Sequence, residues 1–216
     1  MSETIRTYQT RVPANPDVPF ADYACLMSQV ERNLFADLAR GKTPKDLKSS
    51  YLVRFGITAR QFNAVRVELE GKVDSISKRH IQLIELKKQQ IKSLEEKIPK
   101  IKSKATRHQK NRRLEMLRKR LQELEVAKEQ KKISLCFGSK KLFAAQFHLE
   151  KNGYATHEEW KRDWQEARSS EIFILGSKDE SNGNQTCTPS LAEDGSITLR
   201  VRMPDALISQ HGKYIL

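Results

Sequence analysis

A dense run of cations lies near the middle of the chain, between Lys97 and Arg113. The run, KIPKIKSKATRHQKNRR, contains eight Lys or Arg and no Asp or Glu. Because like charges at this density repel one another, a nearby anion lowers their free energy, and a phosphate backbone supplies evenly spaced anions. The run therefore predicts contacts to a nucleic-acid backbone with little sequence preference, and a solvated loop is the alternative. The eight cations are Lys97, Lys100, Lys102, Lys104, Arg107, Lys110, Arg112 and Arg113.

A second segment, TARQFNAVR at residues 58–66, offers amide and guanidinium side chains at helical spacing. With Phe62 facing a core, its polar side chains fall near one another on the remaining faces, and Gln61 sits in the first turn. Such groups make bidentate contacts to base edges, so we predict sequence-specific contacts to DNA here. An ordinary capped helix start, with Thr58 as the cap, is the alternative. The candidate residues are Arg60, Gln61, Asn63 and Arg66.

A third segment, the loop GSKDESNGNQ at residues 176–185, is rich in hydrogen-bond donors and acceptors. Its backbone N–H groups and Lys178 are able to contact phosphates or the 2′-hydroxyl groups of RNA. A plain hairpin turn is the alternative interpretation of the same residues.

The sequence predicts neither a catalytic site nor a metal site. His157-Glu158-Glu159-Trp160 lacks the second histidine of HExxH, and a strand would send the adjacent Asp179 and Glu180 to opposite faces. The three cysteines are far apart and form no CxxC pair. We therefore expect no catalytic residue and no metal ligand in this chain.

The charge of the chain is strongly basic and unevenly distributed. Among 216 residues, 40 Lys or Arg stand against 27 Asp or Glu, a formal net charge of +13. Residues 61–133 hold 21 of these cations and 10 of these acids, so a partner meets a basic stripe. Nucleic acid rather than membrane is the expected partner. Since no apolar run reaches roughly 18 residues, we expect a soluble protein of the reducing cytoplasm.

Hydrophobic periodicity predicts helices in the first two thirds of the chain. A helix over residues 22–40 comes first, and a short one runs from Thr43-Pro44 to the region of Tyr51. Beyond Thr58 apolar residues recur every three or four positions, and they do so again over residues 114–124. Two long helices packed as an antiparallel hairpin would bury both seams, with Pro99 interrupting the chain between them.

Strand-like runs dominate the last third of the chain. The runs ISLCF (133–137), EIFILGS (171–177) and SITLRVRMP (196–204) are predicted strands. An amphipathic stretch lies between the first two, and turn signals at residues 181–184 and 193–195 separate the later ones as in hairpins. The alternating segment at residues 4–12 is predicted to join the same sheet.

Two stretches carry a family likeness. They are ISLCFGSKKLFAAQFHLEKNGYATHEEWKRDWQEARSSEIFILGSKDESNGNQTCTPSLAEDGSITLRVRMPD, residues 133–205, and GITARQFNAVRVELEGKVDSI, residues 56–76. They resemble the N-terminal half of TnpB, the OrfB-type protein of bacterial insertion sequences and a relative of the type V CRISPR effectors. TnpB-type proteins are RNA-guided DNA nucleases whose RuvC-like carboxylates and zinc-binding cysteines follow the region matched here. The resemblance thus implies a chain that is not an enzyme by itself and holds no cofactor, because the divalent metal belongs to that later region.

The resemblance also implies an α+β fold. A helical recognition lobe with a long antiparallel hairpin, residues 16–132, would be inserted into an incomplete oligonucleotide-binding-like β-barrel, the wedge domain. Residues 1–15 would give the first strand of that domain and residues 133–216 its remainder, truncated within the strand that begins near Gly212.

The resemblance implies that the chain binds a guide RNA and double-stranded DNA next to a short sequence, the transposon-adjacent motif. The implied location is the cytoplasm, and the nucleoid when DNA is bound. The helix that begins near Thr58 would lie beside the motif. Two alternatives stay open: the recognition half of a split nuclease completed by a separate RuvC-like chain, and a basic helical hairpin that binds nucleic acid without specificity. The residues implied to bind RNA are Ser139, Lys140, Lys141, Lys178, Asn184, Arg200 and Arg202.

Overall fold

The structure, a computed structural model of the 216-residue chain, describes residues 19–176 and 184–215. These residues are mostly helical and include one small three-stranded antiparallel sheet, so the predicted α+β class is confirmed. The predicted strand at residues 4–12 and the candidate Lys178 lie outside the described residues. The chain divides into two compact units. Unit 1 takes Asp37–Ala64 and the described parts of Met1–Asn33 and Ser169–Leu216, and unit 2 takes Leu34–Ala36 and Val65–Arg168.

Local signals in the sequence explain the helices of unit 1, which are α1 (Phe20–Ala39), α2 (Pro44–Phe55) and the start of α3 (Ala59–Lys97). The Thr43 side chain accepts a hydrogen bond from the backbone N–H of Asp46, and Pro44 occupies the first helical position of α2. Gly56 ends α2 in the left-handed conformation, at φ 56°. All three helices confirm the prediction from periodicity.

An aromatic cluster forms part of the interior of unit 1. The ring of Tyr51 lies 5.2 Å from that of Phe55 and 5.8 Å from that of Phe62, in tilted and edge-on arrangements that aromatic rings prefer. Tyr23 and Val30 of α1 are also fully buried. The apolar faces of α1, α2 and the start of α3 thus supply the core predicted from their spacing.

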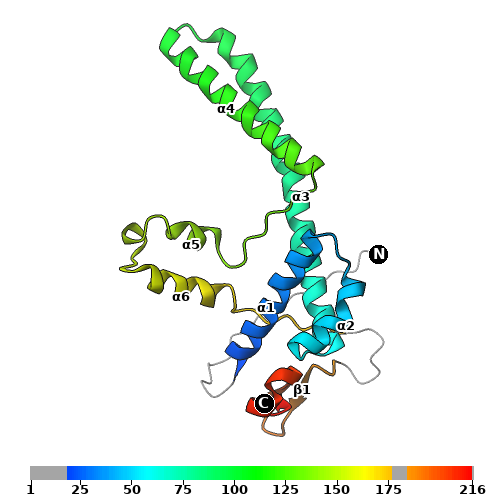
Figure 1. Cartoon of the computed structure of the whole chain (residues 1–216). Coiled ribbons are helices and arrows are strands. Elements are labelled where there is room, and N and C mark those ends of the chain that lie inside the picture. Colours follow the sequence, from blue (N-terminus) through cyan, green and yellow to red (C-terminus); the bar gives the residue numbers. More distant parts are fainter. Residues whose placement is uncertain (1–18, 177–183, 216) are drawn as a thin grey trace. The chain divides into compact units, whose positions relative to one another are not determined.

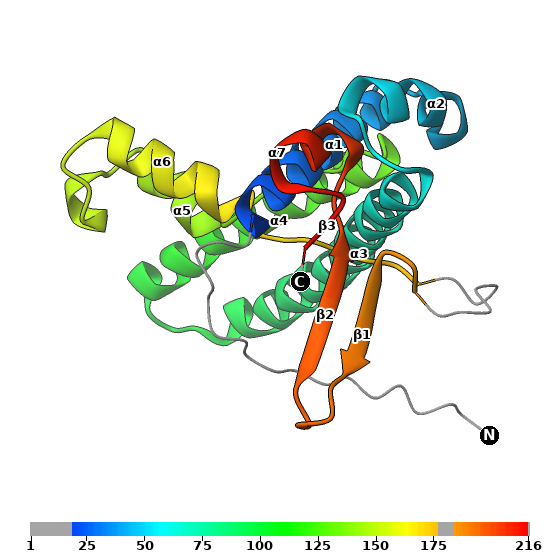
Figure 2. The ribbon, with the colours of Figure 1, turned by 90° about the horizontal axis from the view of Figure 1, so that it is seen from below.

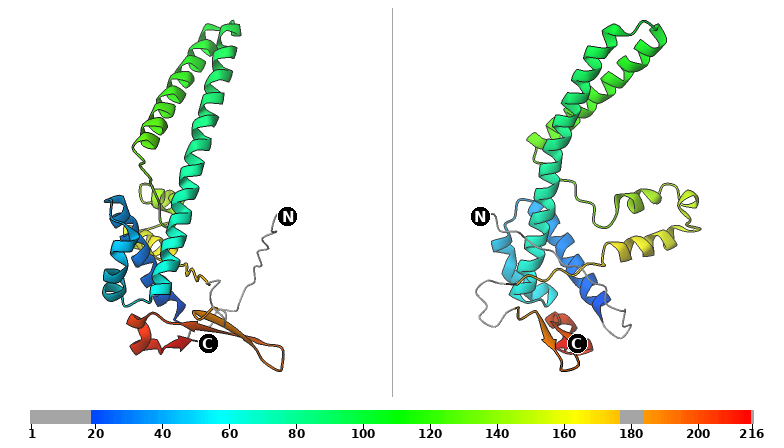
Figure 3. Two further views of the ribbon diagram at one scale, coloured as in Figure 1. Left: turned by 90° about the vertical axis from the view of Figure 1, so that its right-hand side faces the viewer. Right: turned by 180° about the vertical axis from the view of Figure 1, so that it is seen from behind.

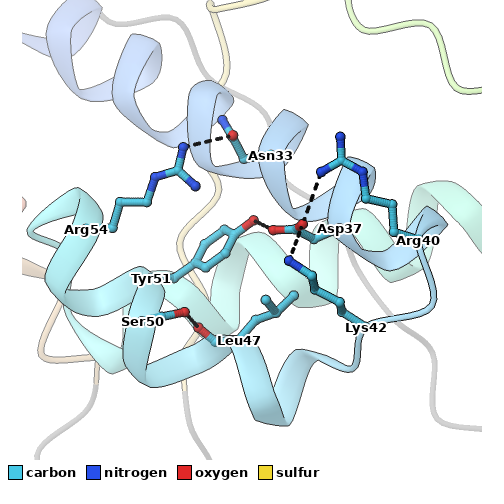
Figure 4. A network of polar contacts seen from close by, with 8 residues as sticks. All are labelled: Asn33, Asp37, Arg40, Lys42, Leu47, Ser50, Tyr51 and Arg54. Carbon is cyan, nitrogen blue, oxygen red and sulfur yellow. Dashed lines mark hydrogen bonds and ion pairs between the residues drawn. The ribbon is translucent and has the colours of Figure 1, made fainter.

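A carboxylate joins the end of α1 to α2 (Figure 4). Asp37 accepts hydrogen bonds from the Lys42 ammonium at 2.9 Å and from the Tyr51 hydroxyl at 2.7 Å, and the Arg40 guanidinium lies 3.5 Å away. The Lys42 and Tyr51 hydrogen bonds hold the pKa of Asp37 below its usual value. Burial and the neighbouring carboxylate raise the pKa of Tyr51. The network therefore favours a charged Asp37 and a neutral Tyr51.

The sheet of unit 1 consists of β1 (Cys187–Leu191), β2 (Ile197–Arg202) and β3 (Tyr214–Ile215), in that spatial order (Figure 2). Leu191 pairs with Ile197 across the turn at residues 193–195, which confirms the predicted turn and the predicted strand after it, whereas β1 is not among the predicted strands. Along β2 and just after it, Val201 and Met203 are buried, whereas Arg200 is exposed and Arg202 half-exposed. This alternation gives the sheet one apolar face and one polar face.

Two of the predicted strands are wrong. Neither Ile133–Phe137 nor the described part of EIFILGS, residues 171–176, forms a strand. A strand needs a partner for its backbone hydrogen bonds, and an apolar run alone does not provide one. Phe137 instead packs edge-on against Phe35, with ring centroids 5.7 Å apart. In the described residues the sheet is accordingly open and three-stranded.

The long hairpin of unit 2 is formed by α3 and α4 (Lys104–Glu129), joined through the short helix η1 (Ile98–Lys100). The two helices run side by side in opposite directions (Figures 1 and 3). Ion pairs between Glu95 and Arg118 at 2.6 Å, and between Lys88 and Glu125 at 3.1 Å, link them one heptad apart. Buried apolar side chains line the seam, namely Ile84, Ile91 and Leu114. The antiparallel hairpin is thus confirmed.

A second, smaller pair of helices completes unit 2: α5 (Lys140–Ala145) and α6 (His157–Ala167), with the short helix η2 (Glu150–Asn152) between them. A reciprocal capping box between Thr156 and Glu159 starts α6. Trp160 is 3% exposed, and its indole N–H donates to the backbone carbonyl of Leu142 at 2.7 Å. That hydrogen bond and the burial of Trp160 hold α5 and α6 together.

Gly56 is the point at which the end of α2 meets the short helix η3 (Asp205–Leu207), which lies between β2 and β3 in the chain. Its carbonyl accepts a hydrogen bond from the backbone N–H of Ala206 at 2.9 Å. A Cβ added to Gly56 would lie 2.8 Å from the Cβ of Ala206, whereas one added to Gly41, also at positive φ, would meet nothing within 4 Å.

We expect Gly56→Ala to destabilise the protein more than Gly41→Ala. Both variants place a side chain in the left-handed region, at a cost of roughly 1–2 kcal/mol, but only Gly56→Ala adds a collision with backbone. The measurement is the free energy of unfolding of both variants in urea. Equal losses would show that the Gly56–Ala206 contact does not constrain the fold.

Candidate nucleic-acid interface

The eight cations predicted from the sequence gather at the turn of the α3–α4 hairpin, which we call the tip (Lys97–Arg113). The tip is held by backbone-directed hydrogen bonds. The Ser103 side chain accepts from the backbone N–H of Thr106 to cap α4, and the Arg107 guanidinium donates to the carbonyl of Ile101 at 2.6 and 3.2 Å. The cations therefore project from a hydrogen-bonded turn.

The tip cations are exposed and lack acidic partners. Seven of the eight are exposed, and Lys110 is half-exposed. Among the described residues, none of the eight forms an ion pair with a carboxylate, whereas Lys88 and Arg118 further along the hairpin do. The tip is thus a concentration of unneutralised positive charge, which a polyanion would relieve.

A groove of about 640 Å³ lies between α3 and α4 next to the tip. Three tip cations line it, Lys97, Lys110 and Arg113, together with apolar side chains such as Leu94 and Leu117. No carboxylate belongs to its described lining. Positive charge therefore extends from the tip into the space between the helices.

In unit 1, Gln61 lies at the centre of a buried hydrogen-bond cluster. Its side-chain oxygen accepts from the backbone N–H of Thr58 at 2.9 Å, and the Thr58 hydroxyl accepts from the Gln61 N–H at 3.2 Å. Its amide nitrogen donates to the Tyr23 hydroxyl at 3.1 Å and to the backbone carbonyl of Arg202 at 3.4 Å. Gln61 is 3% exposed, so its amide faces the protein interior and not a base edge.

The Tyr23 hydroxyl is the partner of Gln61 on α1. Burial raises the pKa of Tyr23 above its usual value, and the hydrogen bond from Gln61 acts in the opposite direction. The phenol therefore stays neutral over the physiological range and serves as a fixed acceptor for the amide. The cluster joins α1, the start of α3 and β2.

A pocket of about 250 Å³ lies where the start of α3 meets the sheet, and we call it the α3–sheet pocket. Among the described residues, its lining includes two guanidinium groups and two threonine side chains but no acid. The partial positive charge at the N-terminal end of α3 adds to that of the arginines, so an oxyanion such as phosphate fits the pocket. Its lining residues are Thr58, Ala59, Arg60, Gln185, Thr186, Arg202 and Tyr214.

The arginines of β2 are held on the polar face of the sheet. Arg202 pairs with Tyr214 in the ladder and donates to Asp205 at 2.9 Å, while its Nε is buried without a hydrogen-bond partner in the described part of the chain. The Arg200 guanidinium lies over the Tyr214 ring, 4.8 Å from its centroid. The sheet thus presents two cations and one aromatic ring together.

The structure separates the residues predicted to read DNA. Arg60 lines the α3–sheet pocket beside Arg202, although the sequence assigned these two to different nucleic acids. Asn63 is half-exposed, and both carboxylate oxygens of Glu70 lie 2.8 Å from Arg66. One helix face therefore does not present all four side chains to a ligand.

The residues implied to bind RNA fall into two groups. Arg200 and Arg202 lie on the sheet, and Asn184 precedes β1, where its side-chain oxygen accepts from the backbone N–H of Thr186 at 2.9 Å. Ser139 caps α5 by accepting from the backbone N–H of Leu142, and Lys140 and Lys141 are exposed in the first turn of that helix. The second group belongs to unit 2.

Sequence reasoning missed Tyr23, Thr186 and Tyr214. Tyr23 shows only the spacing of a core residue, and nothing local indicates that its hydroxyl meets Gln61. Tyr214 becomes part of the pocket through its pairing with Arg202, a register set by tertiary structure.

Across residues 19–176 and 184–215, no three His, Cys, Asp or Glu side chains gather in a way that could hold a metal ion. In the same part of the chain, no helix combines the length and apolar character needed to cross a membrane.

Comparisons with known proteins identify no relative. No family model matches the chain, and neither a curated protein nor a solved structure matches it. The resemblance of residues 56–76 and 133–205 to TnpB therefore stays a prediction from the sequence.

We expect Gln61→Ala to lower the free energy of unfolding by on the order of 2–3 kcal/mol, because it removes the side-chain half of the Thr58–Gln61 capping pair and leaves buried polar partners such as the Tyr23 hydroxyl unsatisfied. Asn63→Ala is the matched control on the same helix. Since Asn63 is half-exposed, its replacement should cost within about 0.5 kcal/mol. Chemical denaturation followed by circular dichroism measures both. Equal stability of the two variants would contradict a structural role for the Gln61 amide.

Proposed function

We propose that this protein binds nucleic acid, with the hairpin tip of unit 2 holding a phosphate backbone. The observation that carries the proposal is the set of eight tip cations, none of which has a carboxylate partner among the described residues. Elsewhere on the hairpin, several cations form ion pairs with Asp or Glu, namely Arg66, Lys72, Lys78, Lys88, Arg118 and Arg120. A surface that keeps its positive charge unpaired while its surroundings are neutralised suits a polyanionic ligand.

The hairpin favours backbone contacts over base contacts. Residues 63–136, which include all of α4 and most of α3, contain no Phe, Tyr or Trp. Proteins that bind unpaired strands usually stack bases on aromatic rings, and the hairpin offers none. Its affinity should therefore come from the release of counterions, with a strong dependence on salt.

The α3–sheet pocket supports a second contact, in unit 1. Arg60 and Arg202 bring two guanidinium groups to one small cavity, whose described lining holds no acid although Asp205 pairs with Arg202 beside it. A phosphate held there would receive hydrogen bonds from both arginines and the favourable potential of the α3 terminus. We assign this pocket to a phosphate of a bound nucleic acid.

We propose further that the nucleic acids are those of a TnpB-like system: a guide RNA, and duplex DNA next to a short motif. The support is the resemblance of residues 56–76 and 133–205 and the basic hairpin that the resemblance implies. In this proposal the sheet and the segments beside it belong to a wedge-like domain, and the chain binds without cutting. Cleavage would need a separate RuvC-like chain.

Neutralising part of the tip should weaken binding and flatten its salt dependence. We expect Lys100, Lys102 and Lys104, replaced together by Gln, to reduce the slope of log K against log salt by roughly 2–3 units on duplex nucleic acid. Arg107 is left in place because it holds the turn. Filter binding over a series of salt concentrations gives the slope.

The matched control replaces Lys78, Lys88 and Arg118 by Gln. It removes the same formal charge from cations of α3 and α4 that are already paired with Asp74, Glu125 and Glu95. Its slope should stay within about one unit of the unmodified protein. If both triple variants change the slope equally, net charge and not the tip governs binding.

A titration with two RNAs separates guide binding from general basicity. One RNA is transcribed from the 3′ end of the protein's own locus, and the other is a scrambled sequence of equal length. We expect the native RNA to remain bound at roughly 200 mM salt while the scrambled RNA dissociates. Equal, salt-sensitive binding of both would reduce the function to that of a non-specific basic hairpin.

A further inference from the structure

Two exposed phenylalanines stand side by side on the α5 segment. Phe143 is 41% and Phe147 is 69% exposed, and their ring centroids lie 6.5 Å apart in an edge-on arrangement. The backbone N–H of Phe147 donates to the carbonyl of Ala144, so the chain still turns helically there. Phenylalanine is usually buried, and two such rings together in solvent indicate a binding surface.

The interior of the α5–α6 pair does not need the exposed ring of Phe147. Trp160 and Ala145 are buried at 3% and 4% exposure, and Trp160 already connects to α5 through Leu142. The Phe143 ring packs against Trp164 in a tilted arrangement, with centroids 5.6 Å apart, and that contact fixes its orientation. Phe147 lies beyond it, so its ring remains available to a ligand.

Two lysines accompany these rings. Lys140 comes three positions before Phe143, a spacing that places both on one face of α5, and Phe147 lies in the turn that follows the end of α5 at Ala145. Lys140 and Lys141 are exposed, and in residues 19–176 and 184–215 neither has an acidic partner. We call Lys140, Phe143 and Phe147 the α5 platform.

We propose that the α5 platform stacks unpaired bases of RNA, with Lys140 and Lys141 on the adjoining phosphates. Rings beside free cations are the combination that holds single strands, since every base has a stacking face. An apolar protein partner would leave both ammonium groups without a counter-charge. The inference rests on the proposed function and extends it: the tip holds backbone, whereas the α5 platform holds bases that are not paired.

Phe147→Ala tests the platform on the full chain. The probe is a single-stranded RNA that carries one 2-aminopurine, whose fluorescence is quenched when the base stacks. We expect the variant to bind this RNA roughly tenfold more weakly and to lose the quenching, with an unchanged slope of log K against log salt. Because the side chain is 69% exposed, the melting temperature should not change, and a thermal melt verifies this.

Two further variants separate stacking from a general apolar contact. Phe147→Tyr keeps the ring and should bind and quench like the unmodified protein, while Phe147→Leu keeps an apolar side chain without a ring and should behave like Phe147→Ala. If Phe147→Leu binds the RNA as tightly as the unmodified protein, base stacking is overturned. Tighter binding of single-stranded DNA than of RNA of the same sequence would overturn RNA as the occupant.

The same titrations distinguish failure of the platform from failure of the proposed function. If the unmodified chain binds duplex through the tip but Phe147→Ala does not alter single-stranded binding, only the platform is wrong. If the unmodified chain binds neither duplex nor single strand at low salt, the proposed function fails as well.

Discussion

The hydrogen bonds of the Gln61 side chain are the interaction on which unit 1 depends. This one amide completes the reciprocal capping pair with Thr58 at the start of α3, and it donates to the Tyr23 hydroxyl of α1 and to the backbone carbonyl of Arg202 in β2. A buried amide of this kind cannot be replaced by an apolar side chain without leaving several polar groups unsatisfied. Because it fixes β2 against the start of α3, it also sets where Arg60 and Arg202 face each other in the α3–sheet pocket.

The two units handle positive charge in different ways. In unit 1 the Arg202 guanidinium is anchored by Asp205, so its position is set before any ligand arrives. On the hairpin of unit 2, ion pairs such as Glu95–Arg118 neutralise the body and let the helices approach, and the remaining charge accumulates at the tip. A pre-positioned arginine fixes the geometry of a contact, whereas a cluster of exposed, unpaired cations raises affinity without fixing the register of the ligand.

Features decided by neighbouring residues could be predicted, and those decided by distant ones could not. Thr43, Thr58 and Ser103 cap helices that periodicity had already indicated, and the turn at residues 193–195 sets its own hairpin. The runs at 133–137 and 171–176 look like strands but depend on partners elsewhere. The direction of Gln61 is a similar case: the spacing that makes it a cap also places it among potential base readers, and only the position of Tyr23 decides between them.

The distribution of aromatic residues gives the two surfaces of unit 2 different absorption and fluorescence in the near ultraviolet. Both tryptophans of the chain, Trp160 and Trp164, belong to α6 and stack at 5.3 Å, and Phe143 touches the second of them. Residues 63–136 contain no ring that absorbs or emits in the near ultraviolet. Tryptophan emission therefore reports on the α5–α6 pair alone, while the tip is spectroscopically silent. The protein thus carries a natural fluorophore beside the α5 platform. A fluorescent label at the tip would not overlap with tryptophan in the same part of the chain.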